Sequence, residues 1–121
     1  MENKIMIVDD AAFMRMVIKD TLKKSGYENL IEAPDGERAV ELYKLEKPNL
    51  VFMDITMPNK DGLQALKEIK AFDPEAKVVM CSAMGQQTIV LEAIQVGAKD
   101  FIVKPFKGER ILKTVNNILG A

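Results

Sequence analysis

The chain has 121 residues, enough for one folded domain and too few for two, so we expect a single domain over residues 1–121. Its 48% hydrophobic and 29% charged residues are typical of a globular domain, and its net charge of −1 argues against nucleic-acid binding. The absence of histidine excludes nucleophile systems that need a histidine base, and the single cysteine excludes an internal disulfide.

In chain order, five short apolar runs alternate with five stretches of helical periodicity. The runs predict strands at residues 4–8, 29–33, 50–53, 77–81 and 100–103. The first four helical stretches end at Ser25-Gly26, Lys47-Pro48, Asp73-Pro74 and Val96-Gly97, and the last carries an apolar stripe from Ile111 to Leu119. Each predicted strand is therefore followed by a predicted helix.

This alternation predicts a parallel sheet, because a return to the same edge requires a helix-length connection. The continuous apolar runs agree, since a half-exposed sheet would show alternating polar residues. A closed barrel would need about eight such units. We therefore expect an α/β fold of (βα)5 order, doubly wound and flavodoxin-like, with a five-stranded parallel sheet in the order 2-1-3-4-5.

Polar side chains follow four of the predicted strands. Asp9 and Asp10 follow the first strand, Asp54 the third, Ser82 the fourth and Lys104 the fifth. In an open parallel sheet the binding crevice lies beyond the carboxyl ends of the strands. We therefore expect three carboxylates, one hydroxyl and one ammonium group to meet at one edge.

Such a cluster of carboxylates needs positive charge. At roughly 5 Å and an effective dielectric near 20, each pair of carboxylates repels by about 3 kcal/mol. Lys104 supplies one compensating charge, and the oxygen ligands suit a hard divalent cation such as Mg²⁺. Magnesium and lysine together neutralise a phosphoryl group during transfer, and a carboxylate can be the covalent nucleophile. The residues thus favour phosphoryl chemistry.

Each of these residues also has a simpler explanation. The Asp9-Asp10 pair could be a solvated turn or a helix cap, and Asp54 could be a turn former. Ser82 could cap the next helix, and Lys104 could be a surface charge. Their joint placement at four strand ends makes coincidence the weaker interpretation.

The remaining features favour an intracellular protein. No apolar run approaches the roughly 20 residues that a membrane span needs, and residues 1–4 do not resemble a signal peptide. We expect a cytoplasmic location with no membrane binding. Cys81 lies in a predicted strand, where a buried small hydrophobe is favoured over a reactive thiol.

Four segments at the strand ends resemble the receiver domains of two-component response regulators. They are Ile7-Val8-Asp9-Asp10, Met53-Asp54-Ile55-Thr56-Met57-Pro58, Cys81-Ser82-Ala83-Met84 and Phe101-Ile102-Val103-Lys104-Pro105-Phe106. The likeness runs the whole length of the chain, and the combination of segments is specific although each alone is weak. Residues 11–16 and 82–87 are similar to the stand-alone chemotaxis type within this family.

The resemblance implies that Asp54 accepts a phosphoryl group from a histidine kinase. In the family's pattern Asp10 binds Mg²⁺ directly and Asp9 acts mainly through a coordinated water. Asp54 and the backbone carbonyl of Thr56 are the further metal ligands. Without a histidine, the chain would need another protein as donor. It would catalyse only its own phosphorylation and dephosphorylation, so we do not expect an enzyme.

The resemblance also implies a conformational switch. Lys104 would contact one phosphoryl oxygen and Ser82 another, and Phe101 would turn inward as Ser82 shifts. The surface formed by roughly residues 86–119 would change, and partners would read it. The Lys104-Pro105 bond resembles the family's cis bond. Phe101 replaces a frequent tyrosine, which leaves the switch to packing alone.

A chemotaxis-type regulator of this kind would take its phosphoryl group from a CheA-like histidine kinase. It would act as a monomer on a flagellar motor switch protein or an adaptor, with a dedicated phosphatase as a further partner. With the chain ending at Ala121, we expect no output domain. One alternative is a phosphorelay intermediate. Another is a phosphohydrolase with Asp54 as nucleophile, although Thr56 stands where such enzymes place a second aspartate.

Overall fold

The computed structural model describes residues 3–120, in which five strands alternate with five helices. The strands are β1 (Ile5–Val8), β2 (Leu30–Ala33), β3 (Leu50–Asp54), β4 (Val78–Ser82) and β5 (Asp100–Val103). The helices are α1 (Ala12–Lys24), α2 (Gly36–Glu46), α3 (Gly62–Phe72), α4 (Gln87–Val96) and α5 (Gly108–Leu119). The order of elements is the one that the sequence predicts.

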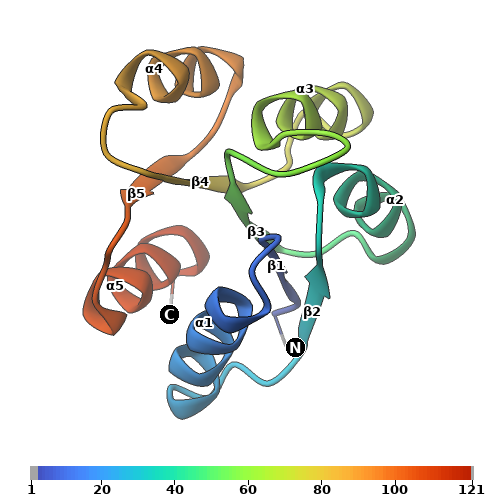
Figure 1. Ribbon diagram of the computed structural model, residues 1–121. Coiled ribbons are helices and arrows are strands. Elements are labelled where there is room, and N and C mark those ends of the chain that lie inside the picture. The colour runs from blue at the N-terminus through green and yellow to red at the C-terminus, as the bar shows by residue number, and fades with distance from the viewer. Residues whose placement is uncertain (1–2, 121) are drawn as a thin grey trace.

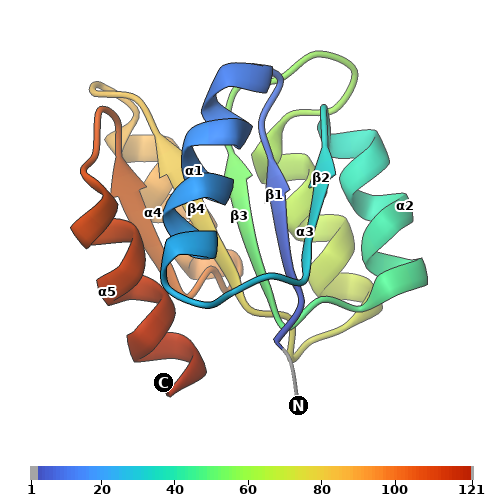
Figure 2. The ribbon, with the colours of Figure 1, turned by 90° about the horizontal axis from the view of Figure 1, so that it is seen from below.

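The five strands form one parallel sheet in the order β2-β1-β3-β4-β5, which confirms the predicted fold. Figure 2 shows all of its strands running in the same direction. The predicted ends of β3 and β4 fall one residue too early. Asp54 pairs with Cys81, and Ser82 pairs with Val103, so both polar residues belong to the sheet. Their backbones are thereby fixed at its carboxyl edge.

Each face of the sheet has its own hydrophobic core. Neighbouring strand residues point to opposite faces. Ile5 and Phe52 pack in the core under α1 and α5, whereas Met6 and Met53 pack in the core under α2, α3 and α4. Figure 1 shows these two helix layers on either side of the sheet. Burying one such side chain contributes about 1.5–3 kcal/mol, so the two cores hold the strand ends in a fixed register.

The ends of the helices agree with the predicted boundaries. Ser25 and Gly26 follow α1, and Gly26 has a φ of 91°, which an L residue with a side chain rarely adopts. Lys47, after α2, is left-handed at φ 46°. Among the described residues, no helix combines the length and apolar character that a membrane crossing requires.

Cys81 is buried in the core under α1 and α5, with 2% of its surface exposed. Burial raises the pKa of its thiol to about 12. A thiol reacts as its thiolate, which such a pKa suppresses at neutral pH. The interpretation of Cys81 as a small buried hydrophobe is confirmed.

Candidate functional site

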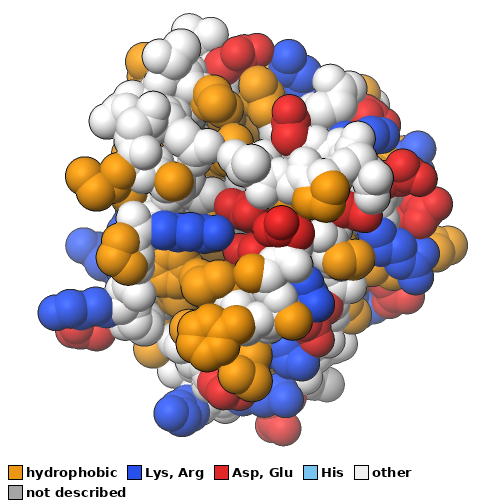
Figure 3. Space-filling view, viewed as in Figure 1, with side chains coloured by type: hydrophobic (Ala, Val, Ile, Leu, Met, Phe, Trp, Pro, Cys, Tyr) orange, Lys and Arg blue, Asp and Glu red, His pale blue; other side chains and the backbone are white. Residues whose placement is uncertain are grey.

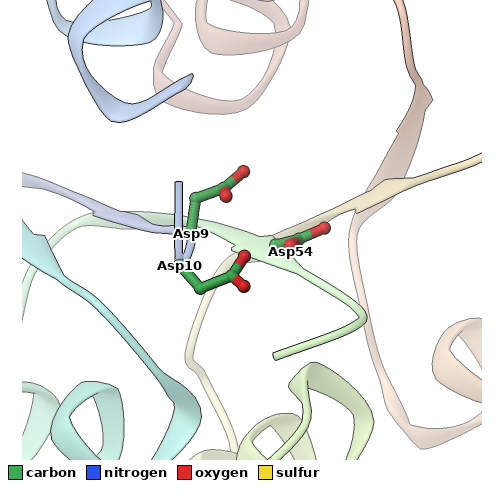
Figure 4. A group of neighbouring side chains, drawn as sticks. All are labelled: Asp9, Asp10 and Asp54. Carbon is green, nitrogen blue, oxygen red and sulfur yellow. The ribbon is translucent and has the colours of Figure 1, made fainter. Parts of the chain in front are cut away.

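The carboxyl edge of the sheet brings together three carboxylates that lie far apart in the sequence. Asp9 and Asp10 follow β1, and Asp54 is the last residue of β3. One oxygen from each carboxylate lies within 4.8 Å of the others. Figure 4 shows the three carboxyl groups projecting into the same space beside the end of β3. Hard oxygen donors at this spacing suit Mg²⁺, so the donor set fits the metal that the sequence predicts.

Lys104 supplies the positive charge of this cluster. Its ammonium nitrogen lies 2.9 Å from Asp9 Oδ2 and 3.1 Å from Asp54 Oδ1. Burial by itself would lower the pKa of Lys104, but hydrogen bonds to Asp9 and Asp54 outweigh it and raise the pKa. Lys104 therefore stays protonated, and its interpretation as a plain surface charge is wrong. Figure 3 shows acidic side chains near the centre of this face with a basic side chain beside them.

The loop after β5 is held against β4. The backbone N–H of Lys104 donates to the carbonyl of Ser82 over 2.7 Å, and this bond extends the pairing of the two strands. The Lys104-Pro105 peptide bond is cis, as expected. The backbone hydrogen bond to Ser82 places Lys104 at the ends of β4 and β5, beside the carboxylates.

Asp54 is only 8% exposed, which makes it a buried carboxylate. Its Oδ1 accepts the backbone N–H of Ile55 at 3.0 Å in addition to the Lys104 ammonium. Burial raises the pKa of Asp54, and the charge on Asp9 adds to this shift, whereas Lys104 opposes it. A buried carboxylate of raised pKa beside a fixed cation is typical of a functional site.

The start of α3 packs directly against the backbone of Asp54 and Ile55. The backbone N–H of Gly62 donates to the carbonyl of Ile55 over 2.7 Å. A Cβ atom at Gly62 would lie 2.0 Å from the backbone oxygen of Asp54, far inside van der Waals contact. Only glycine lets the first turn of α3 pack this closely against the strand that carries Asp54.

The two aspartates after β1 lie in different environments. Asp9 is 2% exposed, and its Oδ1 accepts the backbone N–H of Ala11 at 2.9 Å. Asp10 is exposed and faces the same space with its carboxylate. The N-cap of α1 is Ala11, which makes no side-chain capping bond, so the interpretation of the pair as a helix cap is wrong.

Ser82 does not cap a helix either, because it ends β4 and α4 begins only at Gln87. It is buried, with 1% of its surface exposed. Ser82 also lines an apolar groove of about 360 Å³, together with Val90 of α4 and Phe101 of β5. Phe101 is 39% exposed at this groove. The hydroxyl at the carboxyl edge and the aromatic ring at the surface thus border one hollow.

Sequence reasoning assigned no role to Gln86, yet its side chain joins two of the loops at the site. It accepts the backbone N–H of Ala83 at 2.7 Å and donates to Thr56 Oγ1 at 3.0 Å. Nothing in the residue pattern marks this contact, because it depends on how the loops after β3 and β4 are folded. Thr56 itself is exposed.

The sequence profile of the response regulator receiver domain matches residues 5–116 of this chain. The chain belongs to this family. Receiver domains of this kind are signalling proteins, which fits a site built from carboxylates and one lysine at the sheet edge.

Within the family, the chain is similar to chemotaxis proteins named CheY. It is 60% identical to the CheY of Bacillus subtilis over 119 residues, which cover 98% of this chain and 99% of that protein. It is 56% identical to the CheY of Thermotoga maritima, with 98% of each chain covered. These similarities define a CheY-like receiver domain.

Solved structures agree with the fold. A CheX-CheY-BeF3-Mg complex from Borrelia burgdorferi matches with a TM-score of 0.92 and 36% identity, over 97% of this chain and 89% of that chain. The receiver domain of NtrX from Brucella abortus matches with a TM-score of 0.91 and 37% identity, over 98% of this chain and 99% of that chain. The five-stranded receiver architecture is shared with both.

Proposed function

We propose that this chain is a chemotaxis-type response regulator whose Asp54 accepts a phosphoryl group from a histidine kinase. The main support is the cluster of Asp9, Asp10 and Asp54, whose carboxylate oxygens lie within 4.8 Å of one another. The Lys104 ammonium forms ion pairs with Asp9 and Asp54. Similarity to CheY proteins along nearly the whole chain supports the chemotaxis assignment.

In this proposal Asp54 is the acceptor, because the segment from Met53 to Pro58 resembles the phosphoacceptor segment of the family. A carboxylate oxygen of Asp54 forms the new bond to phosphorus, while the bond between phosphorus and the donor's histidine nitrogen breaks. The departing imidazole takes up a proton. This chain contains no histidine, so the donor belongs to another protein, for which we propose a CheA-like kinase.

The metal ligands in this proposal are Asp10, Asp54, Asp9 through a coordinated water, and the backbone carbonyl of Thr56. When bound, Mg²⁺ offsets the negative charge of the carboxylates and of the incoming phosphoryl group. Lys104 turns its ammonium from Asp54 to a phosphoryl oxygen, a short move because it already lies 3.1 Å from that carboxylate. Ser82 donates its hydroxyl to another phosphoryl oxygen.

The output surface comprises roughly residues 86–119, from α4 through α5. Phe101 is half-exposed beside the apolar groove that Ser82 also lines, so a shift of Ser82 opens a route for the ring to move inward. The partners we propose are a motor switch protein or an adaptor. A dedicated phosphatase is a further partner, in keeping with the CheX-CheY complex of the relative. We propose that residues 1–121 work as one monomeric receiver domain in the cytoplasm.

Acetyl phosphate with Mg²⁺ is expected to add one phosphoryl group to the protein, because the site itself holds the groups that promote transfer. Intact-protein mass spectrometry measures the addition. Excess chelator is expected to suppress it, since the carboxylates would repel the donor without the metal. Equal incorporation with and without Mg²⁺ would contradict the proposed role of the metal.

Asp10→Asn is expected to weaken Mg²⁺ binding by at least tenfold, because it removes the exposed carboxylate that binds the metal directly. The same change is expected to raise the melting temperature of the metal-free protein. Asp10 adds a charge within 4.8 Å of two other carboxylate oxygens, although water screens part of the repulsion at its exposed position. Calorimetry with and without Mg²⁺ checks both effects, and unchanged affinity would remove Asp10 from the ligand set.

A further inference from the structure

Gln86 connects the two loops that flank the phosphorylation site. Its side-chain Oε1 accepts the backbone N–H of Ala83 at 2.7 Å, and its Nε2 donates to Thr56 Oγ1 at 3.0 Å. A backbone N–H can only donate, so the oxygen of the amide must face Ala83. Ala83 belongs to the loop between β4 and α4, and Thr56 to the loop between β3 and α3. One side chain therefore ties the switch side of the site to its metal side.

Gln86 is also the residue directly before α4. Its own side chain does not cap that helix, because both of its polar atoms are used by the two loops. Val90, in the first turn of α4, lines the groove next to Phe101. A movement of Gln86 is therefore passed directly to the helix that forms one wall of the groove.

We propose that Gln86 is a positioning residue that latches the unphosphorylated conformation of the loop between β4 and α4. This inference rests on the proposed function. Ala83 follows Ser82 in the chain, so a shift of Ser82 toward a phosphoryl group on Asp54 displaces the N–H that Gln86 holds. The hydrogen bond from Ala83 then breaks, and the start of α4 is released from Thr56.

The latch makes phosphorylation less favourable, because part of the binding free energy is used to break its two hydrogen bonds. Removing the amide lowers this cost and increases the population of the conformation that accepts the phosphoryl group. From the net value of ordinary protein hydrogen bonds, we expect about a fivefold gain in affinity for a phosphoryl mimic. If the Gln86 side chain instead stabilised the phosphorylated conformation, its removal would lower the affinity for the phosphoryl mimic.

The test measures binding of beryllofluoride, a noncovalent phosphoryl mimic, at saturating Mg²⁺ by isothermal titration calorimetry. Gln86→Ala is expected to bind it about fivefold more tightly than the unmodified protein. Gln95→Ala is the matched control, because Gln95 is the same residue type at an exposed position of α4, lies outside the groove, and makes no side-chain hydrogen bond within residues 3–120. It is expected to bind beryllofluoride as the unmodified protein does.

Three further readouts separate the latch from a general structural role. Mg²⁺ affinity without beryllofluoride is expected to be the same in Gln86→Ala as in the unmodified protein. Thr56→Val removes one end of the latch and is expected to give part of the gain in beryllofluoride affinity. The double variant Gln86→Ala with Thr56→Val is expected to gain less affinity than the two single variants added together, because both remove the same hydrogen bond. Equal or weaker beryllofluoride binding by Gln86→Ala would overturn the latch. No binding by the unmodified protein would overturn the proposed function, and the latch with it.

Discussion

Asp54→Asn is expected to abolish phosphoryl incorporation from acetyl phosphate, as measured by intact-protein mass spectrometry. The amide has nearly the shape of the carboxylate but is not a nucleophile for phosphorus. Its oxygen can still accept from Lys104 and from Ile55, which now bond to Asp54 Oδ1 at 3.1 and 3.0 Å. The loss of incorporation is therefore expected without a loss of structure.

Stability provides the control for this variant. The pKa of Asp54 is raised above its ordinary value of 3.8 by burial, so the ionised carboxylate destabilises the fold once the pH exceeds that value. Asp54→Asn should therefore unfold at a higher temperature than the unmodified protein at neutral pH without Mg²⁺, and the difference should disappear in acid. Asp20→Asn, at an exposed position of α1, should still be phosphorylated. Full labelling of Asp54→Asn would refute the central role of this residue.

Gly62→Ala is expected to lower the free energy of unfolding by about 3 kcal/mol, at the upper end of overpacking effects. The new methyl group would lie 2.0 Å from the backbone oxygen of Asp54, and a backbone atom at the end of a buried strand cannot move aside cheaply. Alanine favours helices over glycine by only about 1 kcal/mol, which does not offset the clash. Chemical denaturation measures the loss.

The same substitution should also affect phosphorylation, because it displaces the residue that accepts the group. A shift of about 1 Å at a reacting group can reduce a rate by roughly 100-fold. Gly108→Ala is the matched control, since Gly108 also begins a helix and its Cβ would meet only the side chain of Thr21, whose methyl group is nearest at 3.2 Å. We expect Gly108→Ala to change neither stability nor phosphorylation by much. Comparable stability of the two variants would show that α3 can withdraw from β3 without cost.

The sequence predicted the fold and the meeting of the site residues for one physical reason. Apolar runs of strand length alternate with helical periodicity, and in a parallel sheet all carboxyl ends lie at one edge. Asp9, Asp54 and Lys104 are each the first polar residues after an apolar run, so topology alone brings them together. Their distances confirm this expectation.

Other features of the site depend on how the loops pack, which residue patterns do not encode. Asp9 and Asp10 are adjacent and chemically identical, yet one is buried and the other exposed. Gly62 looks like any glycine at a helix start, and its contact with Asp54 is visible only in three dimensions. The bridge made by Gln86 likewise requires two loops that are separated in sequence to come together.

The position of β5 at the border of the sheet bears on how a change at the site reaches the surface. It pairs with β4 alone, whereas β3 is bonded to a neighbour on each side. Phe101 and Val103 face outward from this border strand, and Ile102 between them is buried. Any backbone adjustment that accompanies a movement of the Phe101 ring therefore affects the hydrogen bonds to one neighbouring strand only. A change at the carboxylates, which lie near the middle of the sheet, can therefore reach the molecular surface through a border strand.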